Sequence, residues 1–172
     1  MKNMLALWMA LVVALSLSAG GKGGEAADAG NDHEMLAGRV LEVSGEYFLL
    51  ETQTHGTVQV NYGAETVFEG VDAKTLTAGQ FAVVDYDGKM TRSLPGQVFG
   101  QRVGVYAVQG RVDAVAADRF TLIRTDSGEE VIVTLGDTEA SVQPGDDVIV
   151  YTTGVATLSL PAQVNAIGVV KP

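Results

Sequence analysis

The chain of 172 residues is strongly acidic and contains no cysteine. Its formal net charge is −10, from 11 Lys and Arg against 21 Asp and Glu, and 47% of its residues are hydrophobic. The hydrophobic fraction is high enough for a folded core. The lack of cysteine excludes disulfides, thiolate metal sites and a cysteine nucleophile, and the acidic charge argues against binding to nucleic acid.

The N-terminal residues have the pattern of an export signal. Lys2 precedes an almost unbroken apolar run over residues 5–17, and small residues follow at 18–20. This run is shorter than the roughly 20 residues of a transmembrane helix. We therefore predict a signal peptide over residues 1–20 and a mature protein that begins between Ala19 and Glu25. The expected location is periplasmic or extracellular, without membrane insertion after the signal is removed.

Residues 21–35 are predicted to form a flexible tether. Gly, Ala, Asp and Glu dominate residues 20–32 without any periodicity, so this segment cannot bury enough surface to offset its ordering entropy. His33 and its acidic neighbours have metal-ligating side chains, but a flexible segment gives them no preset geometry. No metal site is expected there.

One sequence pattern occurs twice. Gly88 begins a stretch with the pattern G-x-x-T-x-S-L-P-x-Q-V, and Gly154 begins the same stretch 66 residues later. Upstream, Gly-Arg-Val at 38–40 recurs at 110–112, an offset of 72 residues. Such repetition predicts two copies of one structural unit, over residues 36–106 and 107–172. The offset falls by seven residues after the third strand, which places an insertion there in the first unit.

Each unit is predicted to contain five strands joined by turns at glycine-containing pairs. In the first unit the expected strands run over 39–43, 47–52, 57–62, 80–86 and 91–105, with a helical turn possible around 72–76. In the second they run over 108–115, 120–125, 130–135, 147–152 and 163–170. Five strands with an irregular insert after the third is the order of an OB-type barrel. The predicted fold is all-β, with two tandem five-stranded OB-like small barrels after a signal peptide and a flexible tether.

The repeated residues resemble an uncharacterised bacterial family of secreted OB-like domains of unknown function, here as a tandem pair. The frame of that family is G-x-V, a turn, a strand ending in G-x-V, a Thr, then L-x-x-G-D-x-V-x-V and a final strand. The first unit matches it with Gly38, Val40, Gly56, Val58, Thr66, Leu76, Gly79 and Val83. The second unit matches it with Gly110, Val112, Gly128, Val131, Thr138, Gly145, Asp146, Val148 and Val150. Gln80 stands in place of the usual Asp, and Val142 in place of the usual Leu. The resemblance implies a small secreted β-barrel module without catalytic residues.

No group of residues predicts an enzyme. The two histidines are His33, in the tether, and His55, at a hairpin tip, so a serine triad is not expected. Acidic pairs occur at 85 and 87, at 129 and 130, and at 146 and 147, where turns leave carboxylates solvated rather than raising their pKa. A calcium site needs six to eight oxygen ligands, and the acids at 85 and 87 are not repeated in the second unit. We predict no catalytic residue, no metal and no cofactor.

OB barrels often bind single-stranded nucleic acid or sugars on one sheet face. Nucleic-acid binding requires a basic groove and exposed aromatic rings. This chain is acidic, and most of its strand aromatics are expected in the core: Tyr47, Phe48, Phe81, Tyr86, Phe99 and Tyr106. Nucleic acid is therefore not an expected partner.

The twice-occurring stretch is the candidate for a specific role, and two interpretations of it are open. In the structural one, its glycine turns the chain, its glutamine pairs backbone groups, and its leucine and valine enter the core. In the functional one, both copies form a surface for a ligand or partner, through Thr91, Ser93, Pro95, Gln97, Thr157, Ser159, Pro161 and Gln163. The predicted function is an exported, non-catalytic binding or interaction module that engages another envelope protein. A soluble binder of a small ligand, cation or glycan is the alternative.

Overall fold

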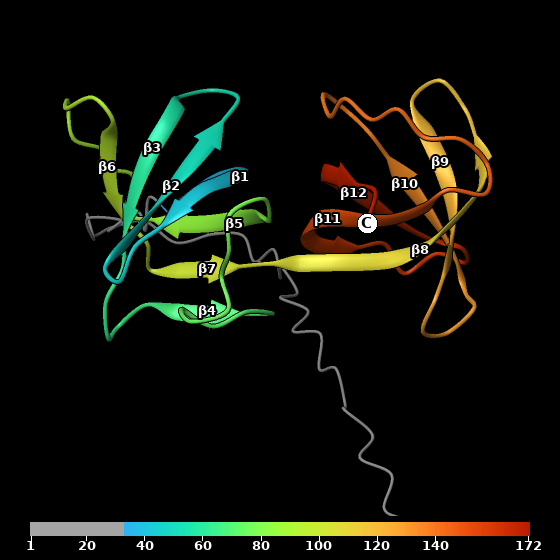
Figure 1. The fold of residues 1–172 in the computed structure, drawn as a ribbon, viewed down its shortest axis with the longest axis horizontal. Helices are drawn as coiled ribbons and strands as arrows, with labels where there is room; N and C mark the ends of the chain where they lie inside the picture. The colour runs from blue at the N-terminus through green and yellow to red at the C-terminus, as the bar shows by residue number, and fades with distance from the viewer. Residues whose placement is uncertain (1–32) are drawn as a thin grey trace, which may run out of the picture. The chain divides into compact units, whose positions relative to one another are not determined.

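The structure, a computed structural model, describes residues 33–172, and within this range it is all-β with no helix. Residues from Asn31 to Pro172 form one compact unit. Its strands are β1 (Glu34–Val43), β2 (Tyr47–Thr52), β3 (Gly56–Asn61), β4 (Val67–Glu69), β5 (Phe81–Tyr86), β6 (Gly96–Phe99), β7 (Arg102–Gly104), β8 (Tyr106–Val115), β9 (Arg119–Arg124), β10 (Glu130–Thr134), β11 (Asp147–Ala156) and β12 (Ala162–Val170) (Figure 1). The predicted signal peptide and nearly all of the predicted tether lie outside the described residues.

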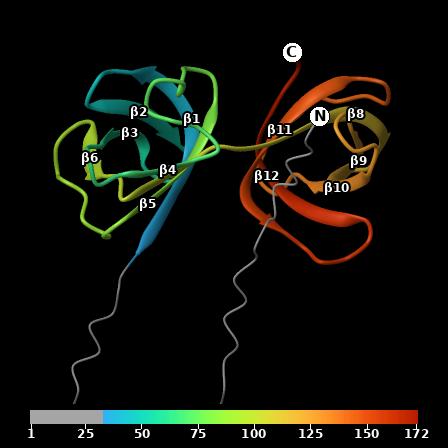
Figure 2. The same ribbon diagram turned by 90° about the horizontal axis from the view of Figure 1, so that it is seen from below.

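The second half of the chain closes into a five-stranded barrel. Its strand order is β10-β12-β11-β8-β9, and Figure 2 shows the five strands curving around one core. The neighbours pair antiparallel except β10 and β12, which are parallel. In chain order, the third strand of the unit therefore pairs with the fifth and the first with the fourth. This is the topology of an OB barrel, as the sequence predicted.

The first half has the same pairings, but its last strand is broken. β6 pairs parallel with β3, while β7 pairs antiparallel with β5. At the break, Gly100 N donates to Asn61 O at 2.9 Å and the next residue, Gln101, donates to Asp85 O at 2.8 Å. The chain thus passes from β3 to β5 between two consecutive residues. The prediction of one continuous strand over 91–105 is wrong for this reason.

The insertion predicted for the first unit forms an extra strand and a turn. β4 pairs parallel with β7, and Phe68 packs its ring edge-on against Tyr62 at a centroid distance of 5.5 Å. Residues 72–76 form a single turn, in which Leu76 N donates to Asp72 O at 3.0 Å. The Asp72 carboxylate accepts hydrogen bonds from two backbone N–H groups of this turn, which lowers its pKa.

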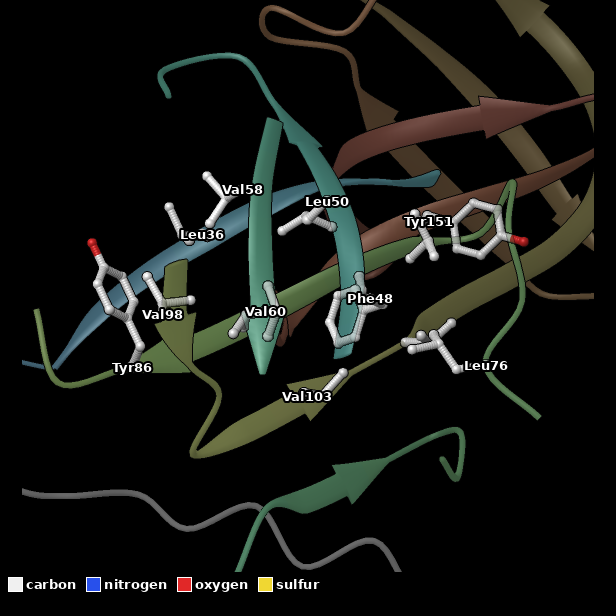
Figure 3. Packing of buried hydrophobic residues seen from close by; sticks show 14 residues of the cluster. Leu36, Phe48, Leu50, Val58, Val60, Leu76, Tyr86, Val98, Val103 and Tyr151 are labelled. Carbon is white, nitrogen blue, oxygen red and sulfur yellow. The ribbon is translucent and has the colours of Figure 1, made fainter. Parts of the chain in front are cut away.

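Each half has its own apolar core. In the first, buried side chains from neighbouring strands meet in the interior, among them Phe48, Leu50, Val58, Val60 and Val98 (Figure 3). Alternate residues along these strands are buried, as expected for a sheet with one face on the core. The corresponding positions of the second half, Phe120, Leu122, Val131, Val133 and Val164, are also buried.

The two glycines of the repeated Gly-Arg-Val motif occupy matching positions where no side chain fits. A Cβ at Gly38 would lie 2.1 Å from Glu51 O, and a Cβ at Gly110 would lie 2.2 Å from Ile123 O. Both contacts are far shorter than a van der Waals distance. The motif therefore marks a close approach between the first two strands of each barrel.

The strand boundaries differ from prediction at both ends of the first unit. Glu34 and Met35 were assigned to the tether, but they lie in β1 and pair with Tyr86 and Asp85 of β5. The Tyr86 hydroxyl donates to the Glu34 carboxylate at 2.5 Å. At the other end, Tyr106 already belongs to β8 and pairs with Thr152 of β11.

Candidate binding loops

The twice-occurring stretch forms two loops of matching structure. We call residues 88–97 the first tip loop and residues 154–163 the second tip loop. The first lies between β5 and β6, and the second joins β11 to β12. In both, the proline immediately precedes the next strand, as predicted for a residue that cannot donate to a ladder. The Leu94-Pro95 and Leu160-Pro161 peptide bonds are both cis.

A chain of hydrogen bonds holds the first tip loop. Gln97 N donates to Thr91 Oγ1 at 2.8 Å, and Thr91 N donates to Gln97 O at 3.0 Å. Ser93 Oγ donates to Pro95 O at 2.8 Å and lies 2.7 Å from Thr91 Oγ1. Because the serine proton is directed at the proline carbonyl, the threonine hydroxyl donates to the serine. Each hydroxyl therefore both donates and accepts, and the loop has a defined conformation.

The second tip loop repeats the same bonds. Gln163 N donates to Thr157 Oγ1 at 2.9 Å, and Thr157 N donates to Gln163 O at 3.0 Å. Ser159 Oγ donates to Pro161 O at 2.8 Å and lies 2.6 Å from Thr157 Oγ1. The two copies agree within 0.1 Å at each of these distances. Three of the four predicted residue types thus maintain the loop conformation in both copies.

The glutamines do not have the role that the structural interpretation gave them. Among the described residues, the side-chain amides of Gln97 and Gln163 make no hydrogen bond, and only their backbone groups close the loop. The prediction that these amides pair backbone groups is wrong, because the threonine hydroxyls do so instead. Val98 and Val164, which follow the glutamines, are buried as predicted.

The leucines of the repeated stretch are in solvent. Leu94 is 99% exposed and Leu160 is 97% exposed, so the prediction that they enter the core is wrong. The hydrogen bonds on either side of each leucine direct the threonine, serine and proline carbonyl inward. The leucine is thereby left at the apex between serine and proline. A Ser-Leu-Pro sequence inside a stretch without strand alternation was the signal for this placement, and sequence reasoning missed it.

The two tips differ around this shared leucine. The second tip loop adds Val155, 71% exposed, and Leu158, 94% exposed, and it contains no ionisable residue. At the same positions the first tip loop has Lys89 and Arg92, both exposed. Lys89 Nζ lies 3.1 Å from Asp87, and this hydrogen bond lowers the pKa of the Asp87 carboxyl. One tip is apolar throughout, and the other combines an apolar apex with cationic flanks.

Some of the acidic residues considered for chemistry form surface ion pairs. Asp146 lies 2.7 Å from Lys171 Nζ, and Asp147 lies 3.0 Å from Arg111 Nε. Both contacts lower the pKa of the carboxyl, which keeps it ionised, whereas a general acid needs a raised pKa. Within residues 33–172, no three His, Cys, Asp or Glu side chains come together as a metal site. None of the described residues belongs to a helix of the length and apolarity needed to cross a membrane.

A cleft of about 430 Å³ is present between β1, β2 and the region from β10 to β12. Gln53 Nε2 donates across it to Asp137 O at 3.2 Å. Its wall includes one cationic side chain, Arg39, and two carboxylates, those of Glu51 and Asp137. Because these charges oppose one another, the cleft has no clear selectivity for a charged ligand.

Comparison with known proteins adds little to this geometry. No protein-family model matches the chain, and no curated protein matches it. A solved structure described as "drosophila Unr CSD456" is similar to it with a TM-score of 0.31 and 13% sequence identity. That similarity covers 82% of this chain, which spans 63% of the length of the other. Identity and TM-score this low carry no information on function.

Proposed function

We propose that this chain is an exported, non-catalytic interaction module that binds another protein of the cell envelope through its two tip loops. The observation that carries the proposal is a leucine at the same apex in both copies, almost fully exposed in each. The fold uses the neighbouring threonine, serine, proline and valine, but it makes no use of the leucine. An apolar side chain that both copies place in solvent is best explained by a contact outside the chain.

Burial against a partner would release useful free energy at these positions. Covering an exposed leucine or valine completely is worth about 1.5–3 kcal/mol. The second tip loop presents three such side chains, Val155, Leu158 and Leu160. Its hydrogen bonds also fix the loop before binding, which reduces the entropy lost on association. We therefore expect the second tip loop to contribute more to affinity than the first.

The charges of the molecule favour a protein partner over a lipid surface. The formal net charge of −10 repels anionic bilayers, and the second tip loop has no Lys or Arg to offset this. The first tip loop, with Lys89 and Arg92, fits an apolar pocket with an acidic rim. The resemblance to secreted bacterial OB-like domains and the apolar N-terminal run support the envelope as the location.

A photo-crosslinking residue placed at Leu94 or at Leu160 tests this proposal in the native envelope. The expected result is a discrete protein adduct at each position, suppressed by an excess of the purified wild-type chain. The same excess of a chain with Leu158→Asp and Leu160→Asp should not suppress the adduct at 160. A crosslinker at Val67, an exposed apolar residue of β4, is the matched control.

Two outcomes would contradict the proposal. One is the same set of adducts from Val67 as from the tips, which would indicate nonspecific contact. The other is co-sedimentation of the chain with phosphatidylcholine vesicles that is lost in Leu158→Asp, which would make the tips membrane anchors. Export is tested separately by N-terminal sequencing, for which we expect a start between Ala19 and Glu25.

A further inference from the structure

The outer face of the sheet in the first barrel carries a group of side chains that the tip loops do not explain. β2, β3 and β6 are neighbours in this sheet (Figure 1). Phe48, Val60 and Val98, one from each strand, point into the core (Figure 3). Because side chains alternate along a strand, the residues next to them point outward.

These outward residues form two rows across the three strands. In one row Tyr47 pairs with Asn61, which pairs with Phe99. In the adjacent row Leu49 pairs with Gln59, which pairs with Gln97. We call these six residues the aromatic–amide face. It has two aromatic rings, three amides and no carboxylate or cationic group.

Part of this face is already ordered and part is available to a ligand. Gln59 Nε2 donates to Asn61 Oδ1 at 2.8 Å, and Asn61 Nδ2 donates to Val98 O at 3.3 Å. Among the described residues the Gln97 amide has no partner. The Phe99 ring is 41% exposed, contrary to the prediction that most strand aromatics lie in the core. The face thus combines a fixed amide pair with an open ring and an open amide.

The fold does not require these residues. In the second barrel the corresponding rows are Arg119, Thr134 and Asn165, and Thr121, Ile132 and Gln163. They contain no aromatic ring and one cation. The strand order and the inward residues are matched between the barrels, so the aromatic side chains of this face are a specific feature of the first.

We propose that the aromatic–amide face binds a neutral oligosaccharide. An amide both donates and accepts hydrogen bonds, as a sugar hydroxyl does. An exposed aromatic ring covers the apolar face of a pyranose, and burial of that surface adds affinity. A strand of nucleic acid would also stack on aromatic rings, but it needs cationic groups for its phosphates. This face has none, on a chain with a net charge of −10. The site is separate from the tip-loop apices.

The test uses the isotope-labelled chain and three neutral hexasaccharides: cellohexaose, maltohexaose and chitohexaose. At least one of them should bind saturably and shift backbone amide resonances of β2, β3 and β6. Phe99→Leu and Tyr47→Leu keep apolar bulk but remove the ring. Each should weaken binding by about tenfold, the loss expected when one stacking contact is removed.

The second barrel provides the matched controls. Asn165→Leu and Arg119→Leu alter the positions that correspond to Phe99 and Tyr47, and they should leave the affinity unchanged. The proposal is overturned if none of the three sugars binds at up to about 10 mM, a concentration that reveals even very weak specific binding. It is also overturned if the control variants weaken binding as much as Phe99→Leu does. A melting curve for each variant separates loss of the site from loss of the fold, and Tyr47→Phe, which retains the ring, should still bind.

Discussion

The two barrels are alike inside and different outside, with one exception at the surface. Their buried phenylalanines, their close-approach glycines and the hydrogen bonds of their tip loops coincide. Their outer sheet faces, their loop flanks and the insertion with β4 do not. The exception is the apex leucine, which is exposed in both. The comparison shows that the fold has constrained what is buried, and that something other than the fold accounts for Leu94 and Leu160.

The largest expected effect tests the likeness of the two cores. Phe48 and Phe120 are both almost fully buried at matching positions. Phe48→Ala and Phe120→Ala should each lower the free energy of unfolding of their own barrel by about 3–5 kcal/mol, through lost burial and the cavity left behind. Denaturant unfolding measures both. A loss below about 1 kcal/mol in only one of them would show that the cores are not equivalent.

A smaller effect should separate the two barrels at alkaline pH. Burial and the hydrogen bond to Glu34 raise the pKa of Tyr86 to about 12 from 10.0, whereas the second barrel has Thr152 at that position. The folded state therefore holds the tyrosine proton more tightly than the unfolded state does. Its contribution to stability is complete below pH 10 and is lost as the pH rises to about 12, in total about 2 kcal/mol.

Denaturant unfolding of wild type and Tyr86→Phe between pH 9 and pH 12 checks this prediction. The wild-type chain should lose more stability over this range than the variant, in which the titrating hydroxyl is absent. Parallel pH dependences in the two proteins would contradict it.

The tip-loop frames should respond equally to a matched change. Thr91→Val and Thr157→Val keep the shape of the side chain but remove the hydroxyl that accepts from the glutamine N–H and donates to the serine. Each should cost about 1 kcal/mol, the usual net value of a hydrogen bond. Thermal unfolding of both variants gives the comparison, and a clear effect in one copy without the other would separate the roles of the two frames.

Much of this architecture follows from the sequence because it rests on local or periodic signals. Alternating apolar residues located most strands, and the repeat at 88 and 154 showed that there are two units. The break at Gly100 was not predictable, because it depends on bonds to β3 and β5, which are distant in sequence. The extension of β1 to Glu34 was missed because its neighbours in the chain are polar, while its partner Tyr86 lies far along the chain.

The candidate site shows the same division. The role of proline at the start of a strand followed from its missing donor, and burial of Val98 followed from alternation. The threonine hydroxyls were not identified as loop clasps, because their partner is the backbone of a residue six positions later. Hydrophobicity alone placed the leucines in the core. Phe99 was misplaced for the same reason, since only the register of β6 against β3 shows which way its ring points.

Denaturant unfolding of Leu94→Ala and Leu160→Ala tests the central claim most directly. If the leucines serve a contact outside the chain, each variant should retain the wild-type free energy of unfolding within about 0.5 kcal/mol, as exposed positions do. If either change costs about 2 kcal/mol or more, that leucine is packed in the folded protein, and the claim that the tips are binding elements is contradicted.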